Sequence, residues 1–213
     1  MPISPGNIRG GLVLLDPVTS QLLRVIQLQY NPDTLTRTLQ IKGAGQESGD
    51  HMEVMRLKGP PVETIKLEAE IDATDQLAAG DTTAMTLGIH PQLAALETMV
   101  YPSSATLLSN NVAASAGNIE IAPVQAALTL FVWSRNRILP VRITELSITE
   151  EAFDTNLNPM RAKVSLGMHV LSVDDVGFDN KGGNLFMSHL QQKEQLATKV
   201  AGSLDALGIK GNP

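Results

Sequence analysis

The stretch TIKLEAEIDA, residues 64–73, has the most regular pattern in the chain. Apolar residues take every second position and charged residues the positions between them: Ile65, Leu67, Ala69 and Ile71 against Lys66, Glu68, Glu70 and Asp72. Because successive side chains of a β-strand point to opposite faces of a sheet, this alternation predicts a strand with one face on a core and the other in water.

Further strands are predicted on both sides of this stretch. Residues 11–30 hold two apolar runs joined by Asp16-Pro17 and Thr19-Ser20, which is typical of a hairpin. A third strand is expected over residues 34–41, and three more near the end of the domain: residues 126–134, 138–153 and 160–173. In residues 138–153 the apolar positions change parity between Ile143 and Leu146, which predicts a bulge near Thr144-Glu145.

Two segments change to helical spacing. Ile89, Leu93, Leu96 and Val100 recur on one side of residues 89–102, which predicts a helix packed on the sheet. In the tail, Asn184 is a candidate helix cap and Gly208 a candidate stop. The stripe between them is a candidate docking surface, formed by Phe186, Leu190, Val200 and Leu204 among its large apolar members.

Two connections are longer than a compact domain normally needs. Residues 42–61 are rich in glycine and end in Pro60-Pro61, and residues 103–123 are small, polar and without a sustained period. Long connections tend to be functional, often by reaching a neighbouring molecule. Both are therefore expected to take part in contacts with other subunits.

Composition limits the possible partners. The net charge is −6 and no cluster of Lys or Arg is visible, so a nucleic-acid groove is disfavoured. The absence of cysteine excludes disulfides and thiolate sites, and no apolar run is long enough to cross a bilayer. The sequence therefore predicts a protein made in the cytosol, with no signal peptide and no direct membrane insertion.

No pattern in the chain points to catalysis. The four histidines, His51, His90, His169 and His189, have no carboxylate or second histidine at a metal-ligand spacing. The acidic pairs are sequence neighbours, which rarely supply two different carboxyl environments, and no nucleophile elbow or phosphate loop is present. We therefore expect no enzyme activity, no metal site and no cofactor.

A corner in residues 27–41, QLQYNPDTLTRTLQI, separates two strand-like runs. Asn31, Pro32 and Asp33 are typical turn residues, so they are a candidate register turn that sets the pairing of the strand that follows. The role predicted for this corner is geometric, and an ordinary turn in an unrelated β domain is the alternative.

The chain resembles the tube-like proteins of contractile injection systems, the phage-tail-like machines. Four segments carry the resemblance, in matching order between about residues 11 and 173: LQYNPDTLTRTL, GPPVETIKLEAEIDATD, IHPQLAALETMVYP and RILPVRITELSITEEAFDTNLNPMRAKVSLGMHVL. It looks most like the baseplate members that join the inner tube to the hub and spike. Many of those carry a peptidoglycan-binding-like LysM module after the tube-like domain, and here a short helical tail stands in its place.

The resemblance implies an α+β fold, with an antiparallel β-barrel or sandwich beside one packed helix over residues 1–175 and a linker with a C-terminal helix over residues 176–213. It also implies a ring, most plainly a homohexamer, that contacts the inner tube protein, the hub and spike and other baseplate proteins. Assembly is expected in the cytoplasm, with release as part of an extracellular particle as an option. A tube terminator or cap, and a soluble β-barrel that binds a small ligand, are the alternatives.

A ring of this kind encloses a channel, and a water-filled channel needs a polar wall. Two strand faces are candidates for that wall: Lys66, Glu68, Glu70 and Asp72, or Arg161, Lys163, Ser165 and His169. An outer face in contact with solvent is the alternative for each.

Overall fold

A computed structural model describes residues 8–43, 57–116, 126–200, 202–203 and 205–209 of the chain. Seven strands form one antiparallel sheet in the order β2-β1-β5-β6-β7-β4-β3. The strands are β1 (Gly11–Leu15), β2 (Leu22–Gln27), β3 (Leu35–Gln40), β4 (Val62–Asp72), β5 (Leu128–Ser134), β6 (Arg137–Phe153) and β7 (Pro159–Val170). The helices are α1 (Thr74–Ala78), α2 (Thr82–Leu87), α3 (His90–Glu97), α4 (Ser104–Ser115), α5 (Val173–Val176) and α6 (Lys181–Ala197), with a 3-10 turn over Asp205–Leu207.

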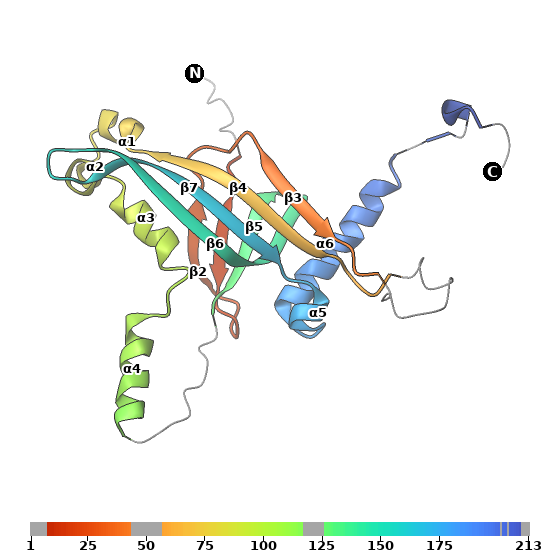
Figure 1. Cartoon of the computed structure of the whole chain (residues 1–213), viewed down its shortest axis with the longest axis horizontal. Coiled ribbons are helices and arrows are strands. Elements are labelled where there is room, and N and C mark those ends of the chain that lie inside the picture. The colour runs from red at the N-terminus through yellow and green to blue at the C-terminus, as the bar shows by residue number, and fades with distance from the viewer. Residues whose placement is uncertain (1–7, 44–56, 117–125, 201, 204, 210–213) are drawn as a thin grey trace.

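The predicted α+β class and antiparallel sheet are confirmed, although the sheet is open. Within the described residues β2 and β3 are its two end strands, and each pairs on one side alone. The sheet curves so that its two halves enclose the core between them (Figure 1). The long strand β6 connects the two halves, because its first residues pair with β5 and the others with β7.

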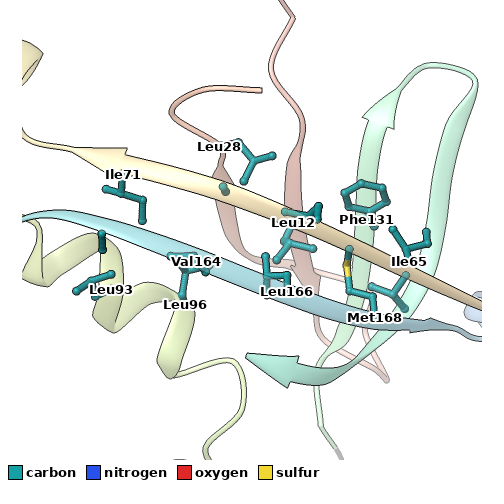
Figure 2. Packing of buried hydrophobic residues seen from close by; sticks show 14 of the residues in the cluster. Leu12, Leu28, Ile65, Ile71, Leu93, Leu96, Phe131, Val164, Leu166 and Met168 are labelled. Atoms are coloured by element: carbon teal, nitrogen blue, oxygen red, sulfur yellow. The ribbon is translucent and has the colours of Figure 1, made fainter. Parts of the chain in front are cut away.

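The alternation in β4 places its apolar side on the core. Ile65 and Leu67 are buried, and Val164 and Leu166 of the neighbouring strand β7 lie on the same face. Leu93 and Leu96 of α3 pack against this face, while Phe131 comes from the other half of the sheet (Figure 2). Removal of this apolar area from water supplies the main driving force for the fold.

The bulge predicted in β6 is confirmed. The pairing of β6 with β7 shifts between Ile143 and Glu145, so that Ile143 and Leu146 both reach the core despite their different parity. Gly167 of β7 lies opposite the bulge, where a Cβ atom would come within 2.9 Å of the Cβ of Glu145. A glycine at this position therefore lets the two strands stay paired through the shift.

Two expectations about helices were wrong. Residues 104–115 form the helix α4, which begins after the cap Ser103, whereas a connection without regular structure was expected over 103–123. The tail helix α6 begins after Asn180 and ends at Ala197, earlier at both ends than the predicted span from Asn184 to Gly208. The fold also contains α1, α2 and α5 beside the one predicted packed helix, α3.

The two connections expected to contact other subunits are only partly described. Residues 44–56 of the first and 117–125 of the second lie outside the described residues. The first connection is closed at its base by an isolated bridge between Gly43 and Leu57.

Candidate functional site: the polar face of the sheet

The two strand faces that the sequence offered as alternatives lie side by side on one surface. β4 and β7 are paired neighbours, with Asp72 opposite Arg161, Glu70 opposite Lys163 and Glu68 opposite Ser165. Residues opposite each other in a sheet share a face, and this face points away from the core. We call it the polar face: Lys66, Glu68, Glu70 and Asp72 of β4, Arg161, Lys163, Ser165 and His169 of β7, and Glu145, Ser147, Thr149 and Glu151 of β6.

Charges of opposite sign are paired across the strands of the polar face. The Nε of Arg161 lies 2.9 Å from Oδ2 of Asp72, and the Nζ of Lys163 lies 2.9 Å from Oε1 of Glu151. Lys66 approaches Glu145 at 3.4 Å. Exposed pairs of this kind contribute about 0–1 kcal/mol to stability. Their main effect is therefore on the character of the surface, which is hydrated and carries both signs.

Hydrogen bonds and ion pairs keep side chains of the polar face in their charged forms. The side chain and backbone of Thr74 donate hydrogen bonds to Asp72, and together with Arg161 they lower the pKa of Asp72. Asp72 in turn raises the pKa of Arg161, and the hydrogen bond to Glu151 raises the pKa of Lys163. Each shift favours the charged form, so these three groups stay ionised at neutral pH.

His169 differs from the rest of this face because it is half-buried beside another element. Its Nε2 lies 3.4 Å from Oδ2 of Asp175 in α5. The same carboxylate accepts a hydrogen bond from the backbone N–H of Ser172 at the start of α5. His169 therefore marks the end of the polar face, where α5 begins to cover the sheet.

The candidate register turn lies at a border of the polar face. Asn31 accepts a hydrogen bond from the backbone N–H of Gly10 at 2.9 Å and donates one to the carbonyl of Ile8 at 2.9 Å. Its amide thus ties the corner between β2 and β3 to the chain that leads into β1. A hollow of about 400 Å³ separates the turn from the polar face, and it is lined by Tyr30, Asn31, Pro32, Asp33, Thr34, Glu68, Ala69, Glu70 and Lys163.

Gln29 makes a second tie at this corner, which the sequence reasoning missed. Its Nε2 donates to the carbonyl of Asp72 at 2.7 Å, and its Oε1 accepts from the N–H of Asp72 at 3.0 Å. The side-chain amide therefore pairs with the end of β4 much as a strand residue would. Gln29 alternates with Gln27 in a strand-like run, and nothing in that pattern distinguishes it.

The candidate docking helix divides into a docked part and an exposed part. Phe186 is buried in the main core and Leu190 packs against that core half-buried. Val200 lies beyond the end of α6 and is exposed, and Leu204 lies outside the described residues. The first half of the predicted stripe therefore docks on the chain's own sheet.

A buried carboxylate joins α6 to the sheet. Glu63 of β4 accepts from Nε of Arg37 in β3 at 2.7 Å, and Lys193 of α6 approaches its second oxygen at 3.4 Å. The Glu63 side chain is 5% exposed. The sequence indicates that Glu63 points inward, because Glu63 has the same parity in β4 as the inward residues Ile65 and Leu67.

Two absences can be stated for the described part of the chain. It contains no group of three or more His, Asp or Glu side chains arranged to hold a metal ion. Among the same residues, no helix combines the length and the apolar character required to cross a membrane.

Comparison with known proteins assigns no family to the chain. Neither the protein-family models nor the curated proteins contain a match to the chain.

Proposed function

We propose that this chain is a structural, ring-forming component of a contractile injection system, a tube or baseplate protein that joins the inner tube to the hub and spike. The observation that carries the proposal is the polar face, because it is continuous over three neighbouring strands of an open, curved sheet. Copies arranged around an axis with these faces inward would enclose a channel with a charged, hydrated wall.

The position of the resembling segments in the fold supports this proposal. They contribute β6, β7, β4 and β3, which are consecutive in the sheet, together with α3, which packs on the opposite side of it. Segments far apart in the sequence thus form one unit that includes the whole polar face. The two end strands also leave free edges in the described structure, and burial between subunits is one way in which proteins manage such edges.

The proposed function implies three kinds of partner. These are other copies of the chain in a homohexameric ring, the inner tube protein, and the hub and spike. A tube terminator of the same machine would use the same ring and differ in its axial neighbours. The role requires no catalytic residue and no cofactor, and places assembly in the cytoplasm before any release of the particle.

A small-ligand binding module is the second candidate, because a largely apolar groove of about 440 Å³ lies between β2 and α3. Native mass spectrometry and negative-stain imaging of the purified chain distinguish the two candidates. The proposed function predicts one closed oligomer, expected to be a hexamer, with a central opening. A monomer that carries a bound small molecule would instead support the binding module.

A second experiment tests the orientation of the polar face. The chain has no cysteine, so Glu68→Cys would carry its only thiol. In assembled rings, this thiol should react with a small maleimide but much more slowly with a bulky polymer-linked one, because a channel restricts the larger reagent. Val18→Cys, at the exposed turn between β1 and β2, is the control that should react with both. Equal rates for the two positions in rings would place the polar face outside the channel.

A further inference from the structure

The helix α4 presents apolar side chains that its own chain leaves uncovered. Figure 1 shows α4 extending away from the sheet, and none of its residues is buried. Leu107, Leu108 and Val112 are 53%, 67% and 68% exposed. At the 100° per residue of an α-helix, Leu108 and Val112 lie one turn apart on one side and Leu107 flanks them. This side of α4 is therefore suited to a partner.

The chemistry of α4 limits what that partner can be. From Thr98 to Asn118 the chain has no charged residue and no histidine. A solvated helix normally carries charged residues opposite its apolar side, whereas α4 carries Ser, Thr and Asn. A charged surface would gain nothing from such a helix, so its partner is expected to be apolar with a few neutral polar groups.

A groove with this character exists on the same chain. Its floor consists of Leu28, Leu96 and Val164, and Val25 forms part of its rim. Arg9 and Glu70 are the only charged residues among those that line it, and the side chain of Glu70 lies on the polar face. The groove has a volume of about 440 Å³, within the range of pockets that hold small organic ligands.

The groove also contains an unsatisfied hydrogen-bond acceptor. The Oε1 of Gln92 is buried and has no partner among the described residues, although its Nε2 donates to Gln76 at 3.1 Å. A buried acceptor without a donor is costly. Gln92 lines the groove, so a helix seated there would pack against this residue.

We propose that α4 of one copy docks into the β2–α3 groove of the next copy, an inference that rests on the ring proposed above. The lengths agree, because twelve helical residues span about 18 Å and the five β2-side residues of the groove span about 16 Å. Helix and groove are different surfaces of the same chain, so the contact is head-to-tail and generates a ring when it closes. Because α4 extends away from its own sheet, the groove it fills belongs to another copy.

Cross-linking tests this contact directly. Two differently tagged chains, one with Leu108→Cys and one with Val25→Cys, would be co-expressed, and the purified rings treated with a short bifunctional maleimide. The inference predicts a cross-link between the two tags. Asn110→Cys lies on the opposite side of α4 and should cross-link to Val25→Cys at least about tenfold less, since the helix turns this side away from the groove.

A charge substitution supplies the second measurement. Leu108→Asp with Val112→Asp should weaken association by about 100-fold, because two apolar side chains lose their burial. Asn110→Asp adds a charge to the other side of α4 and should leave association within about threefold of the parent. α4 contributes no buried residue, so both variants should keep the parental circular dichroism apart from α4 itself.

The outcomes separate this inference from the proposed function. Rings that form without the Leu108–Val25 cross-link would overturn the docking of α4 and leave the ring intact. A closed dimer that gives the Leu108–Val25 cross-link would retain the helix-groove contact and overturn the ring. A parent chain that stays monomeric at all concentrations would overturn both.

Discussion

Replacing Glu63 with alanine should lower the free energy of unfolding by about 3 kcal/mol, the low end of the cost of breaking a buried ion pair. The carboxylate is buried between Arg37 and Lys193, and its loss leaves two cations without their shared partner. The low end applies because the Arg37 side chain is 26% exposed and can regain some hydration. Urea unfolding followed by circular dichroism measures the change.

The loss of local stability should be largest for α6, because Lys193 of α6 makes a charged contact with Glu63 of β4. Trypsin should therefore cleave at Lys193 faster in the Glu63→Ala chain than in the parent. Glu70→Ala provides the control, since Glu70 belongs to the same strand but is exposed on the polar face, and its replacement should change stability by less than about 0.5 kcal/mol. Equal stabilities for the two variants would show that the Glu63 cluster does not hold α6.

Strands could be predicted from this sequence where the evidence for them is local. The alternation in β4 identifies its core-facing residues because side chains in a strand alternate between faces whatever the strand pairs with. The bulge in β6 was predictable for the same reason, since a change of parity between Ile143 and Leu146 requires an extra residue if both are to reach the core.

The helix boundaries were harder to predict because local propensity and tertiary contacts conflict. Gly182 and Gly183 disfavour the first turn of a helix, so the sequence suggested a start at Asn184. At Gly183, however, a Cβ atom would lie 2.0 Å from the carbonyl oxygen of Gly177, so a glycine is required where α5 and α6 meet. α4 was missed because its Ser, Asn and Ala residues give no clear apolar period.

The polar face could be predicted only in pieces. Each of the two strand faces could be recognised alone. Their union depends on the pairing of β4 with β7, and residues 73–158 separate these two strands in the sequence. Strand order in an antiparallel sheet is set by the packing of the complete core, and no local pattern in either strand encodes it. The two faces therefore remained alternatives until the sheet order was known.

The inward side of α6 contains a histidine that makes the stability of the fold depend on pH. His189 is 7% exposed, and neither of its ring nitrogens has a hydrogen-bond partner among the described residues. Burial and the neighbouring Lys193 lower its pKa from 6.5 to about 4, while Glu63 opposes this effect. Arg37 and Arg137 also disfavour the charged form, so His189 is neutral in the folded protein at pH 7.

The direction of the pH dependence follows from the two protonation equilibria. The unfolded chain binds a proton at His189 near pH 6.5, whereas the folded chain does so near pH 4. Stability is therefore complete above pH 6.5 and is lost as the pH falls towards 4, by up to about 3 kcal/mol from this one group. Carboxylates with lowered pKa values, such as Asp72 and Asp175, lose their contributions below about pH 5, so the fall between pH 6.5 and 5 belongs to His189.

The replacement His189→Leu should remove most of this dependence. Leucine has a similar size, cannot bind a proton and leaves no unpaired nitrogen in the core, so the variant should be at least as stable as the parent at pH 7. Between pH 6.5 and 5 its free energy of unfolding should stay nearly level while that of the parent falls. His90→Leu, at the exposed start of α3, should follow the parent. A parental slope that persists in His189→Leu would assign the acid sensitivity to another group, and would show that α6 tolerates a charged imidazole against the sheet.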